Sequence, residues 1–372
     1  MLPDTRTYVN LMTREVRTLT GLRGAAALLV IFYHFFEKDA YYGPYVPWLI
    51  RHGYIAVDMF FVLSGFVIAL SYTHLFQGGV TLTSFRYFMA KRIARIYPLY
   101  ALTIVLFILK AYANVSGAGP GRVYLTDVFA SLGMIQSWGF PFTPIDLAVW
   151  SISTEFFAYL VFPLLVIVVV RRSALYGAAL FALSLLAICA VAYSGQGIAG
   201  QLDVVLPSSP LPLLRCMAGF CLGVVCYRAS STPLGRKLFS SSACFLAALA
   251  VLVIASSIGG PDILLFLTFP VIVLGSAMES DAARVVLANR VIYHFGVISY
   301  SLYMLHPLVV PVKARLEPVA ERFVGHAAHP LTLLFSLLLA WLGSCLLYGF
   351  VERPGRSYLQ HVLLPPRIGQ SA

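Results

Sequence analysis

A histidine and an arginine lie in one apolar run near the N-terminus, and their spacing suggests chemistry inside a membrane. Arg23 follows Gly21-Leu22 at the start of the run, and His34 lies eleven residues after Arg23. On a helix this separation corresponds to about 16 Å, or roughly half of the hydrocarbon core of a bilayer. An imidazole at that depth is costly to bury, so His34 is a candidate functional residue. The alternative is a structural histidine that hydrogen-bonds a neighbouring helix.

Three more ionisable residues, Asp58, Glu155 and His306, are predicted at a similar depth on other helices. A carboxylate beside a histidine fixes its tautomer and raises its basicity, which is the arrangement of a general base. We therefore expect a polar cavity in which Asp58 or Glu155 orients His34. For His306, which precedes Pro307, the alternative is a residue that caps a helix end or contacts lipid headgroups.

Two arginines are predicted to share one face of a helix near the other side of the membrane. Arg92 and Arg95 lie three residues apart, just before an apolar run that begins at Ile96. Residues three apart are neighbours on a helix surface, and two adjacent guanidinium groups suit a phosphate-bearing ligand. The alternative is topology alone, since cytoplasmic segments of membrane proteins are generally basic.

The composition places these residues in a membrane protein. Of the 372 residues, 60% are hydrophobic and 11% are charged, and the mean hydropathy is +0.85, whereas about a quarter of a soluble domain is charged. The shorter run 125–138 is expected to be re-entrant or interfacial. The predicted fold class is all-α, a polytopic membrane protein of about ten transmembrane helices. The predicted spans are 19–36, 54–74, 96–113, 147–170, 174–193, 211–227, 243–258, 262–278, 291–311 and 331–351.

The basic residues indicate the orientation of these spans. With the N-terminus in the cytoplasm, the segments predicted inside hold 18 of the 26 Lys and Arg residues, in line with the positive charge of cytoplasmic loops. Both termini are therefore predicted in the cytoplasm. The net charge of +11 follows from this topology, so we expect no nucleic-acid partner. The six cysteines lack zinc-ligand spacing, and we expect no metal site.

Six short strings occur in order along the chain. They are Leu22-Arg23-Gly24 with His34, Val57 to Phe66, Arg92 to Pro98, Trp150 to Pro163, Ser299 to Pro307, and Val351 to Pro354. As an ordered set they make the chain resemble the acyltransferase-3 family of integral-membrane O-acyltransferases over nearly its whole length. The resemblance implies ten helices in one domain over 1–372. It also implies transfer of an acyl group, usually acetyl, from cytoplasmic acyl-CoA to a sugar hydroxyl.

The resemblance further implies roles for individual residues. His34 corresponds to the family's catalytic histidine, and Arg92 and Arg95 contribute to the donor site. One departure is visible, because Phe156 follows Glu155 where many relatives carry a second acidic residue. That form is similar to the exopolysaccharide-modifying branch of the family.

Together with the residue patterns, the resemblance implies an O-acyltransferase, most simply an O-acetyltransferase, of the bacterial inner membrane. Acyl-CoA is expected to bind at Arg92 and Arg95, with Arg23 near its path, and to deliver its acyl group at His34. The expected partners are acyl-CoA, membrane lipids and a glycan acceptor, either free or lipid-linked. The residues expected to contact substrate are Trp150, Tyr300 and His306.

Two other functions fit the same residues. A transporter or flippase of polyprenyl-linked sugar would use them to bind and release a proton, but the two related halves common in transporters are not evident in the sequence. An acyltransferase could also act on a small glycosylated metabolite such as a macrolide. Direct transfer and a covalent acyl-enzyme intermediate are both compatible with the predicted site.

Overall fold

The computed structural model describes residues 15–36, 46–113, 123–171 and 173–364, which are mostly helical and contain no β-strand in these ranges. The longer helices are α2 (Arg17–Phe36), α4 (Ala56–Tyr72), α5 (Leu82–Tyr112), α7 (Trp150–Arg171), α8 (Ala174–Ala192), α9 (Leu211–Ser230), α11 (Ser242–Ser257), α12 (Asp262–Ala277), α15 (Ser299–Val324), α16 (Ala328–Leu347) and α17 (Arg353–Leu363). The shorter ones are α3 (Trp48–Arg51), η2 (Gly53–Ile55), η3 (Thr73–Phe76), α6 (Leu125–Leu132), η4 (Leu147–Val149), α10 (Pro233–Phe239), α13 (Asp281–Leu287), α14 (Arg290–Val297), η5 (Gly325–Ala327) and the π-helical turn η6 (Tyr348–Glu352). The predicted all-α fold class is confirmed.

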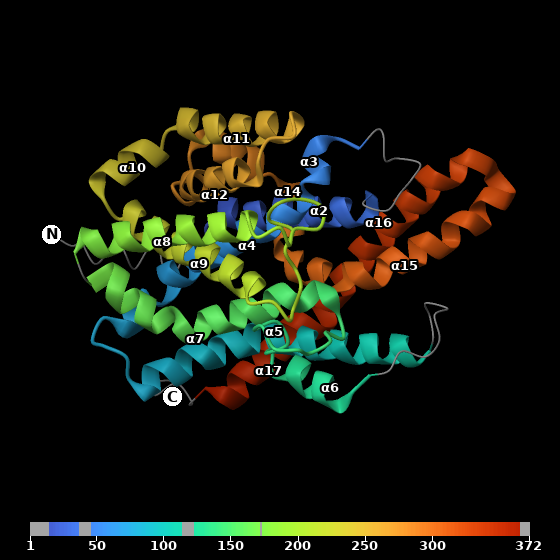
Figure 1. Ribbon diagram of the computed structural model, residues 1–372, viewed down its shortest axis with the longest axis horizontal. Helices are drawn as coiled ribbons and strands as arrows, with labels where there is room; N and C mark the ends of the chain where they lie inside the picture. The colour runs from blue at the N-terminus through green and yellow to red at the C-terminus, as the bar shows by residue number, and fades with distance from the viewer. Residues whose placement is uncertain (1–14, 37–45, 114–122, 172, 365–372) are drawn as a thin grey trace, which may run out of the picture.

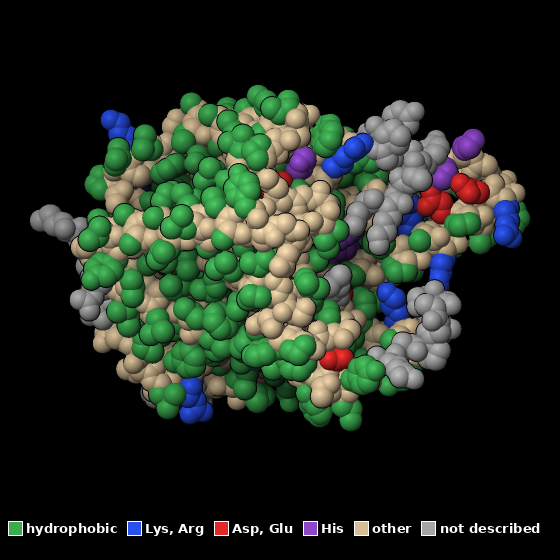
Figure 2. All heavy atoms as spheres, viewed as in Figure 1, with side chains coloured by type: hydrophobic (Ala, Val, Ile, Leu, Met, Phe, Trp, Pro, Cys, Tyr) green, Lys and Arg blue, Asp and Glu red, His purple; other side chains and the backbone are tan. Residues whose placement is uncertain are grey.

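The long helices run roughly side by side along one axis (Figure 1). Helices α2, α4, α5, α7, α8 and α9 form the body of the bundle, and α15 and α16 form a hairpin that projects beyond it at the right of the view. Hydrophobic side chains cover the broad face over α7, α8 and α9, whereas charged side chains gather on the projecting hairpin (Figure 2). This is the distribution of a bundle whose sides face lipid and whose end lies outside it.

The described helices include seven that are long and apolar enough to cross a membrane, or up to nine if each of two bent pairs is one span. The bent pairs are α10 with α11, at 64°, and α12 with α13, at 98°. One of the seven candidates, 299–363, contains both helices of the projecting hairpin. Each of the ten predicted runs falls largely in helix, and the number of ten crossings stays a prediction.

Two predicted boundaries in the C-terminal third are wrong. The run 291–311 is not one helix, because a break at Ile298 separates α14 from α15. The second boundary is the end of this run at 311, because α15 continues to Val324, through most of the residues that lie between the predicted spans 291–311 and 331–351. Its charges are spaced for a helix, with Lys313 Nζ and Glu317 Oε2 2.8 Å apart across one turn. These charges belong to a helix that leaves the apolar region.

The segment 125–138 contains no helix long enough to cross a bilayer, as predicted. Its helix α6 has eight residues, which corresponds to about 12 Å. Hydrogen bonds fix the segment to neighbouring helices. The Tyr100 hydroxyl on α5 donates to the Ser131 carbonyl oxygen at 2.6 Å, and the Ser153 hydroxyl on α7 donates to the Met134 carbonyl oxygen at 2.8 Å. The loop that leads from α6 into α7 is therefore held within the bundle.

The crossing of α4 and α9 depends on glycine. A Cβ on Gly65 of α4 would lie 2.0 Å from the Phe220 carbonyl oxygen, and one on Gly223 of α9 would lie 2.1 Å from the Val62 carbonyl oxygen. Neither position has room for a side chain, so the two helices pack backbone to backbone, as small residues allow in membrane proteins. This contact fixes where Asp58 of α4 lies relative to α9.

Candidate active site

Among the described residues, most of the predicted site residues line two cavities that enter the bundle. The larger has a volume of about 900 Å³ and is lined by His34 and His306 among others; we name it the histidine cavity. The smaller has a volume of about 150 Å³ and is lined by Arg23, Arg92 and Arg95 among others; we name it the arginine cavity. The volume of the histidine cavity is typical of a site for a small-molecule ligand.

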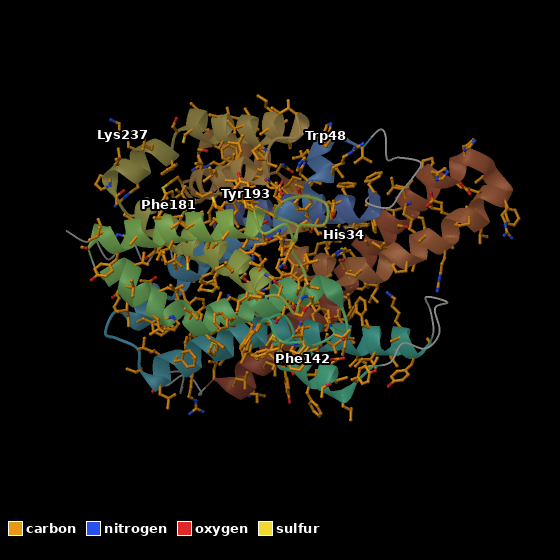
Figure 3. All side chains as sticks on the ribbon, viewed as in Figure 1. His34, Trp48, Phe142, Phe181, Tyr193 and Lys237 are labelled. Atoms are coloured by element: carbon orange, nitrogen blue, oxygen red, sulfur yellow. The ribbon has the colours of Figure 1, made fainter. Side chains whose placement is uncertain are left out.

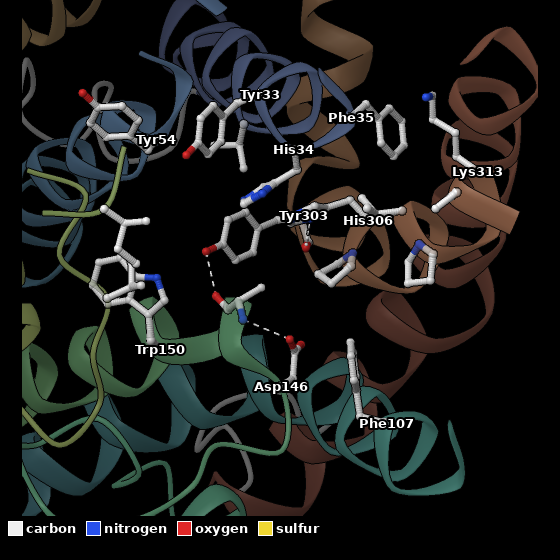
Figure 4. A pocket seen from close by; sticks show the side chains of 18 of the residues that line it. Tyr33, His34, Phe35, Tyr54, Phe107, Asp146, Trp150, Tyr303, His306 and Lys313 are labelled. Carbon is white, nitrogen blue, oxygen red and sulfur yellow. Dashed lines mark hydrogen bonds between the residues drawn. The ribbon is translucent and has the colours of Figure 1, made fainter. Parts of the chain in front are cut away.

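The imidazole rings of His34 on α2 and His306 on α15 stack, with centroids 4.9 Å apart and planes at 25° (Figure 4). His306 is buried, and its Nδ1 lies 2.6 Å from the Tyr303 carbonyl oxygen. In an unbroken helix that carbonyl accepts the backbone N–H four residues later, but that residue is Pro307, which has none. His306 therefore supplies the missing donor through its Nδ1–H, and in the neutral tautomer that carries this proton the lone pair lies on Nε2. The alternative of a helix-end residue is excluded, because α15 continues past it.

A carboxyl group that the sequence analysis did not single out enters the same cavity. Asp146 lies in the loop just before α7, lines the histidine cavity and is 3% exposed. Its Oδ1 accepts the backbone N–H of Ala148 at 2.9 Å, and the Ala148 carbonyl oxygen accepts the Tyr303 hydroxyl at 2.9 Å (Figure 4). Burial raises the pKa of the Asp146 carboxyl to about 7, against the opposing effects of the Ala148 N–H, Lys110 and His34.

Two guanidinium groups of the arginine cavity have unmet hydrogen-bonding capacity. Arg92 on α5 donates from Nη2 to the Tyr72 hydroxyl at 2.8 Å and also lies over the Tyr72 ring. Arg23 on α2 donates from Nη2 to Thr20 Oγ1 at 3.2 Å. The Nε atoms of both arginines are buried and have no hydrogen-bond partner among the described residues. Because a buried donor without a partner is costly, this cavity suits an anionic ligand.

Arg95 and Glu155 also line the arginine cavity, but both have protein partners. Arg95 forms an ion pair with Glu352, and its guanidinium carbon lies 5.3 Å from the centre of the Tyr300 ring. Glu155 accepts a hydrogen bond from the Ser64 hydroxyl. Glu155 therefore lies with the arginines, and the expectation that it orients His34 is not met.

Asp58, the other residue expected to orient His34, is paired with Arg215 of α9. Both side chains are buried, with Nε 2.8 Å from Oδ1 and Nη2 2.6 Å from Oδ2. Arg215 Nη2 also donates to the Tyr54 carbonyl oxygen at 3.2 Å, and its guanidinium carbon lies 5.1 Å from the centre of the Trp150 ring. Both carboxylate oxygens of Asp58 are thus engaged by Arg215, and Asp58 is not the partner of His34.

The structure divides the predicted site residues other than Asp58 between the two cavities. Those that line the histidine cavity are His34, Trp150 and His306. Those that line the arginine cavity are Arg23, Arg92, Arg95, Glu155 and Tyr300. The catalytic, donor-binding and substrate-binding roles assigned to them stay predictions.

Tyr303 and Val57 line both cavities and so form the partition between them. The Tyr303 hydroxyl lies 2.8 Å from Ser151 Oγ, and with its bond to Ala148 this contact fixes the ring between α15 and the start of α7. Any group that moves from one cavity to the other must pass this partition.

The two cavities lie at different levels of the bundle. Arg23 and His34 belong to opposite cavities and to the same helix, where their separation corresponds to about 16 Å along the axis. His34 lies toward the end of α2 that is far from Lys237 on α10 (Figure 3). The two cavities are therefore separated along the axis of α2.

Sequence reasoning gave no role to several polar residues of the cavities and their walls, among them Ser64, Asp146 and Glu352. Ser64 and Glu352 lie within the strings that carry the family resemblance, and this position could have identified them as candidate site residues. Asp146 is the one charged residue between Val128 and Thr154. An isolated acidic residue at the start of an apolar run is a signal for a functional site, and this signal could have identified Asp146.

Comparison with known proteins places the chain among acyltransferases. The sequence model of a family described as "Acyltransferase domain" matches residues 16–349. No solved structure gives a significant match.

Three curated relatives give the range of similarity. The acyltransferase MdmB of Streptomyces mycarofaciens is 35% identical over 159 residues, which cover 40% of this chain and 38% of that protein. BcsY of Komagataeibacter xylinus, provisionally named a membrane-bound transacylase, is 27% identical over 366 residues, covering 92% and 83%. YrhL of Bacillus subtilis (strain 168), provisionally named a peptidoglycan O-acetyltransferase, is 26% identical over 375 residues, covering 92% and 55%. The matches thus span well under two thirds of MdmB and YrhL.

Proposed function

The chain belongs to the acyltransferase-3 family of membrane acyltransferases, and from this premise we propose that it is an O-acyltransferase that uses acyl-CoA. The acyl group, acetyl in the simplest case, passes to a hydroxyl of a glycan such as an exopolysaccharide repeat unit. The observation that supports this proposal most is the pair of cavities, one holding arginines and the other two stacked histidines. Guanidinium groups suit phosphate binding, and histidine is the side chain that most often removes a proton from a hydroxyl.

The donor binds at the arginine cavity. Acyl-CoA carries phosphate groups, and the buried Nε atoms of Arg23 and Arg92 are donors without partners among the described residues. Arg95 contributes charge but shares its guanidinium with Glu352. We therefore assign the direct phosphate contacts to Arg92 and Arg23, and a supporting role to Arg95.

His34 acts as the general base in the histidine cavity. It removes the proton from the acceptor hydroxyl, and the hydroxyl oxygen then attacks the carbonyl carbon of the thioester. The carbon–sulfur bond breaks, and CoA leaves as a thiolate that takes up a proton. The thioester reaches His34 past the partition at Tyr303. A covalent intermediate in which His34 carries the acyl group uses the same geometry.

We assign the arginine cavity to the cytoplasmic side and the histidine cavity to the outer side of a bacterial inner membrane. This orientation follows from the positive charge of the segments predicted inside and brings the donor site to the compartment that contains acyl-CoA. The two termini, predicted in the cytoplasm, include residues 1–14 and 365–372, which lie outside the described residues.

The test is enzyme-dependent acetyl transfer by the purified protein. Acetyl-CoA labelled in its acetyl group is incubated with octyl glucoside, cellobiose or undecaprenyl-phosphate glucose, and both labelled sugar and free CoA are measured. We expect His34→Ala to lower the rate by roughly 10²-fold or more, with an unchanged melting temperature. His361→Ala, at an exposed histidine of α17, is the matched control and should keep the wild-type rate.

A folded wild-type protein that transfers acetyl to none of these sugars would contradict the proposed function. Movement of lipid-linked sugar across vesicles without CoA release would instead support a flippase. Near-normal transfer by a well-folded His34→Ala protein would remove His34 from the mechanism.

A further inference from the structure

Asp146 stands apart from the other buried acids near the histidine cavity because one of its oxygens has no partner. Its Oδ1 accepts the Ala148 N–H, but its Oδ2 is buried and has no hydrogen-bond partner among the described residues. By contrast, Asp262 accepts the Tyr54 hydroxyl and the Leu202 N–H, and Asp58 is paired through both oxygens with Arg215. Buried carboxylate oxygens are normally hydrogen-bonded, so the lack of a partner for Asp146 Oδ2 needs an explanation.

Local structure does not provide one. The turn that leads into α7 uses Oδ1 alone, because Ala148 donates to that atom. Lys110 and His34 act on Asp146 electrostatically, but within the ranges that the structure describes no basic group forms an ion pair with it. Oδ2 therefore offers a hydrogen-bond acceptor at the edge of a cavity that also holds His34 and His306.

The position of Asp146 is rigid enough to select a ligand. The Ala148 N–H holds the carboxyl group, and the Ala148 carbonyl oxygen holds the hydroxyl of Tyr303, which lines the same cavity. A preorganised carboxylate oxygen binds a donor such as a hydroxyl more strongly than a neutral oxygen does. The chemistry that fits Oδ2 is an O–H group of a ligand in the histidine cavity.

We propose that Asp146 is the residue that positions the acceptor: its Oδ2 accepts a hydrogen bond from one hydroxyl of the acceptor sugar while a second hydroxyl faces His34. This inference rests on the proposed function and deepens it. The acceptor must then carry at least two hydroxyl groups, as sugars do. A mono-alcohol would reach His34 without this contact and would react poorly.

The test is Asp146→Asn. An asparagine keeps an oxygen for the Ala148 N–H, but it replaces the accepting Oδ2 by an amide group that donates. With the best sugar of the acetyl-transfer assay, we expect kcat/KM for the acceptor to fall about tenfold to a hundredfold. The KM for acetyl-CoA and the melting temperature should stay unchanged.

Asp127→Asn is the matched control. Asp127 is also a buried aspartate, and its Oδ1 accepts the Thr143 N–H of the same loop at 3.1 Å, but it does not line either cavity. If Asp146 only shapes the loop, the two variants should behave alike. If it binds the acceptor, Asp127→Asn should keep the wild-type kcat/KM.

Deoxy sugars and pH give two readouts that a structural role would not change. One deoxy analogue should lower the wild-type rate but have no further effect in Asp146→Asn, because the same contact is already lost. The other titratable groups that line the cavity with Asp146 are Tyr33 and His34 on α2, Tyr54 on η2, Lys110 on α5, Asp203, Arg215 on α9, Tyr303, His306, Lys313, Glu317 and Glu321 on α15, and His329 on α16. All of them are present in both proteins, so taking the ratio of the two kcat/KM values removes most of their own effect on the rate. The ratio of wild-type to Asp146→Asn kcat/KM should therefore rise with pH through about 7, the pKa of the Asp146 carboxyl.

The outcomes separate this inference from the proposed function. A wild-type protein with no sugar-dependent transfer overturns both. Transfer by the wild type together with equal acceptor kcat/KM in Asp146→Asn overturns the role of Asp146 alone. An equal loss in Asp146→Asn and Asp127→Asn, or a deoxy effect that persists in Asp146→Asn, also overturns it.

Discussion

Buried arginine side chains serve two regions of this bundle in different ways. At the α4–α9 crossing, Arg215 has both oxygens of Asp58, the Tyr54 carbonyl oxygen and the Trp150 ring as partners. In the arginine cavity, Arg23 and Arg92 each leave a buried Nε without a partner among the described residues. The guanidinium groups are chemically identical, but one is saturated by protein and the other two are not.

This difference distinguishes structure from binding more sharply than residue type or depth does. A saturated buried ion pair contributes little to stability relative to an apolar replacement, yet removal of one partner is strongly destabilising. An unsaturated guanidinium is costly in the empty protein and recovers that cost when a phosphate binds. Mutations at Asp58 should therefore affect folding, and mutations at Arg92 should affect the donor.

The largest effect is expected from Asp58→Ala, which leaves Arg215 buried without its carboxylate partner. We expect a loss of about 3–5 kcal/mol in the free energy of unfolding. Thermal unfolding in detergent, followed by size-exclusion chromatography, measures it. The double variant Asp58→Ala/Arg215→Met removes both charges and should recover most of that stability and the transfer activity.

The contrary result would restore the expectation drawn from sequence. If Asp58→Ala folded with a wild-type melting temperature but lost acetyl transfer, Asp58 would act in the chemistry. The comparison between the saturated and unsaturated arginines would then fail.

A smaller effect, on donor binding alone, is expected from Arg92→Ala. Loss of a charge-assisted contact to phosphate should raise the KM for acetyl-CoA about tenfold or more and leave kcat nearly unchanged, because the contact is equal in ground and transition states. A titration of acetyl-CoA measures it. Lys237→Ala, at an exposed cation of α10, controls for general loss of positive charge.

An unchanged KM with a collapsed kcat in Arg92→Ala would contradict the donor assignment. A poorly inserted protein with normal kinetics would indicate that the arginine serves topology alone. Arg95→Ala should differ from Arg92→Ala, because it leaves Glu352 unpaired and so lowers stability as well.

Sequence patterns predicted most of the long helices, but they did not predict where the helices with charged ends begin and end. Apolar runs locate the helices because every backbone group in lipid must be bonded within its own segment. The charged part of α15 lies outside the predicted spans, because a span is recognised by the length of its apolar run. That criterion does not detect a helix that continues beyond the membrane surface. The same physical reasoning predicted that the segment 125–138 does not span, since its apolar run is too short to cross a bilayer.

The sequence predicted most of the residues that line the candidate site, but it did not predict which of them contact one another. Depth along a helix follows from residue number, so His34 and His306 were expected at one level, where their rings stack. Which carboxylate faces which cation depends on rotation and packing of the helices. For this reason Asp58 was expected beside His34, whereas the close crossing of α4 and α9 places it against Arg215, with which it forms an ion pair.

The most direct test of the two-cavity account supplies acetyl-CoA to one face of sealed proteoliposomes. Orientation is set by selecting vesicles in which Ser84→Cys, on a background without the six native cysteines, is labelled from outside by an impermeant thiol reagent. With a sugar acceptor enclosed in the lumen, we predict that external acetyl-CoA acetylates it. Product formed only when acetyl-CoA and the sugar share the lumen would contradict transfer from the arginine cavity to the histidine cavity.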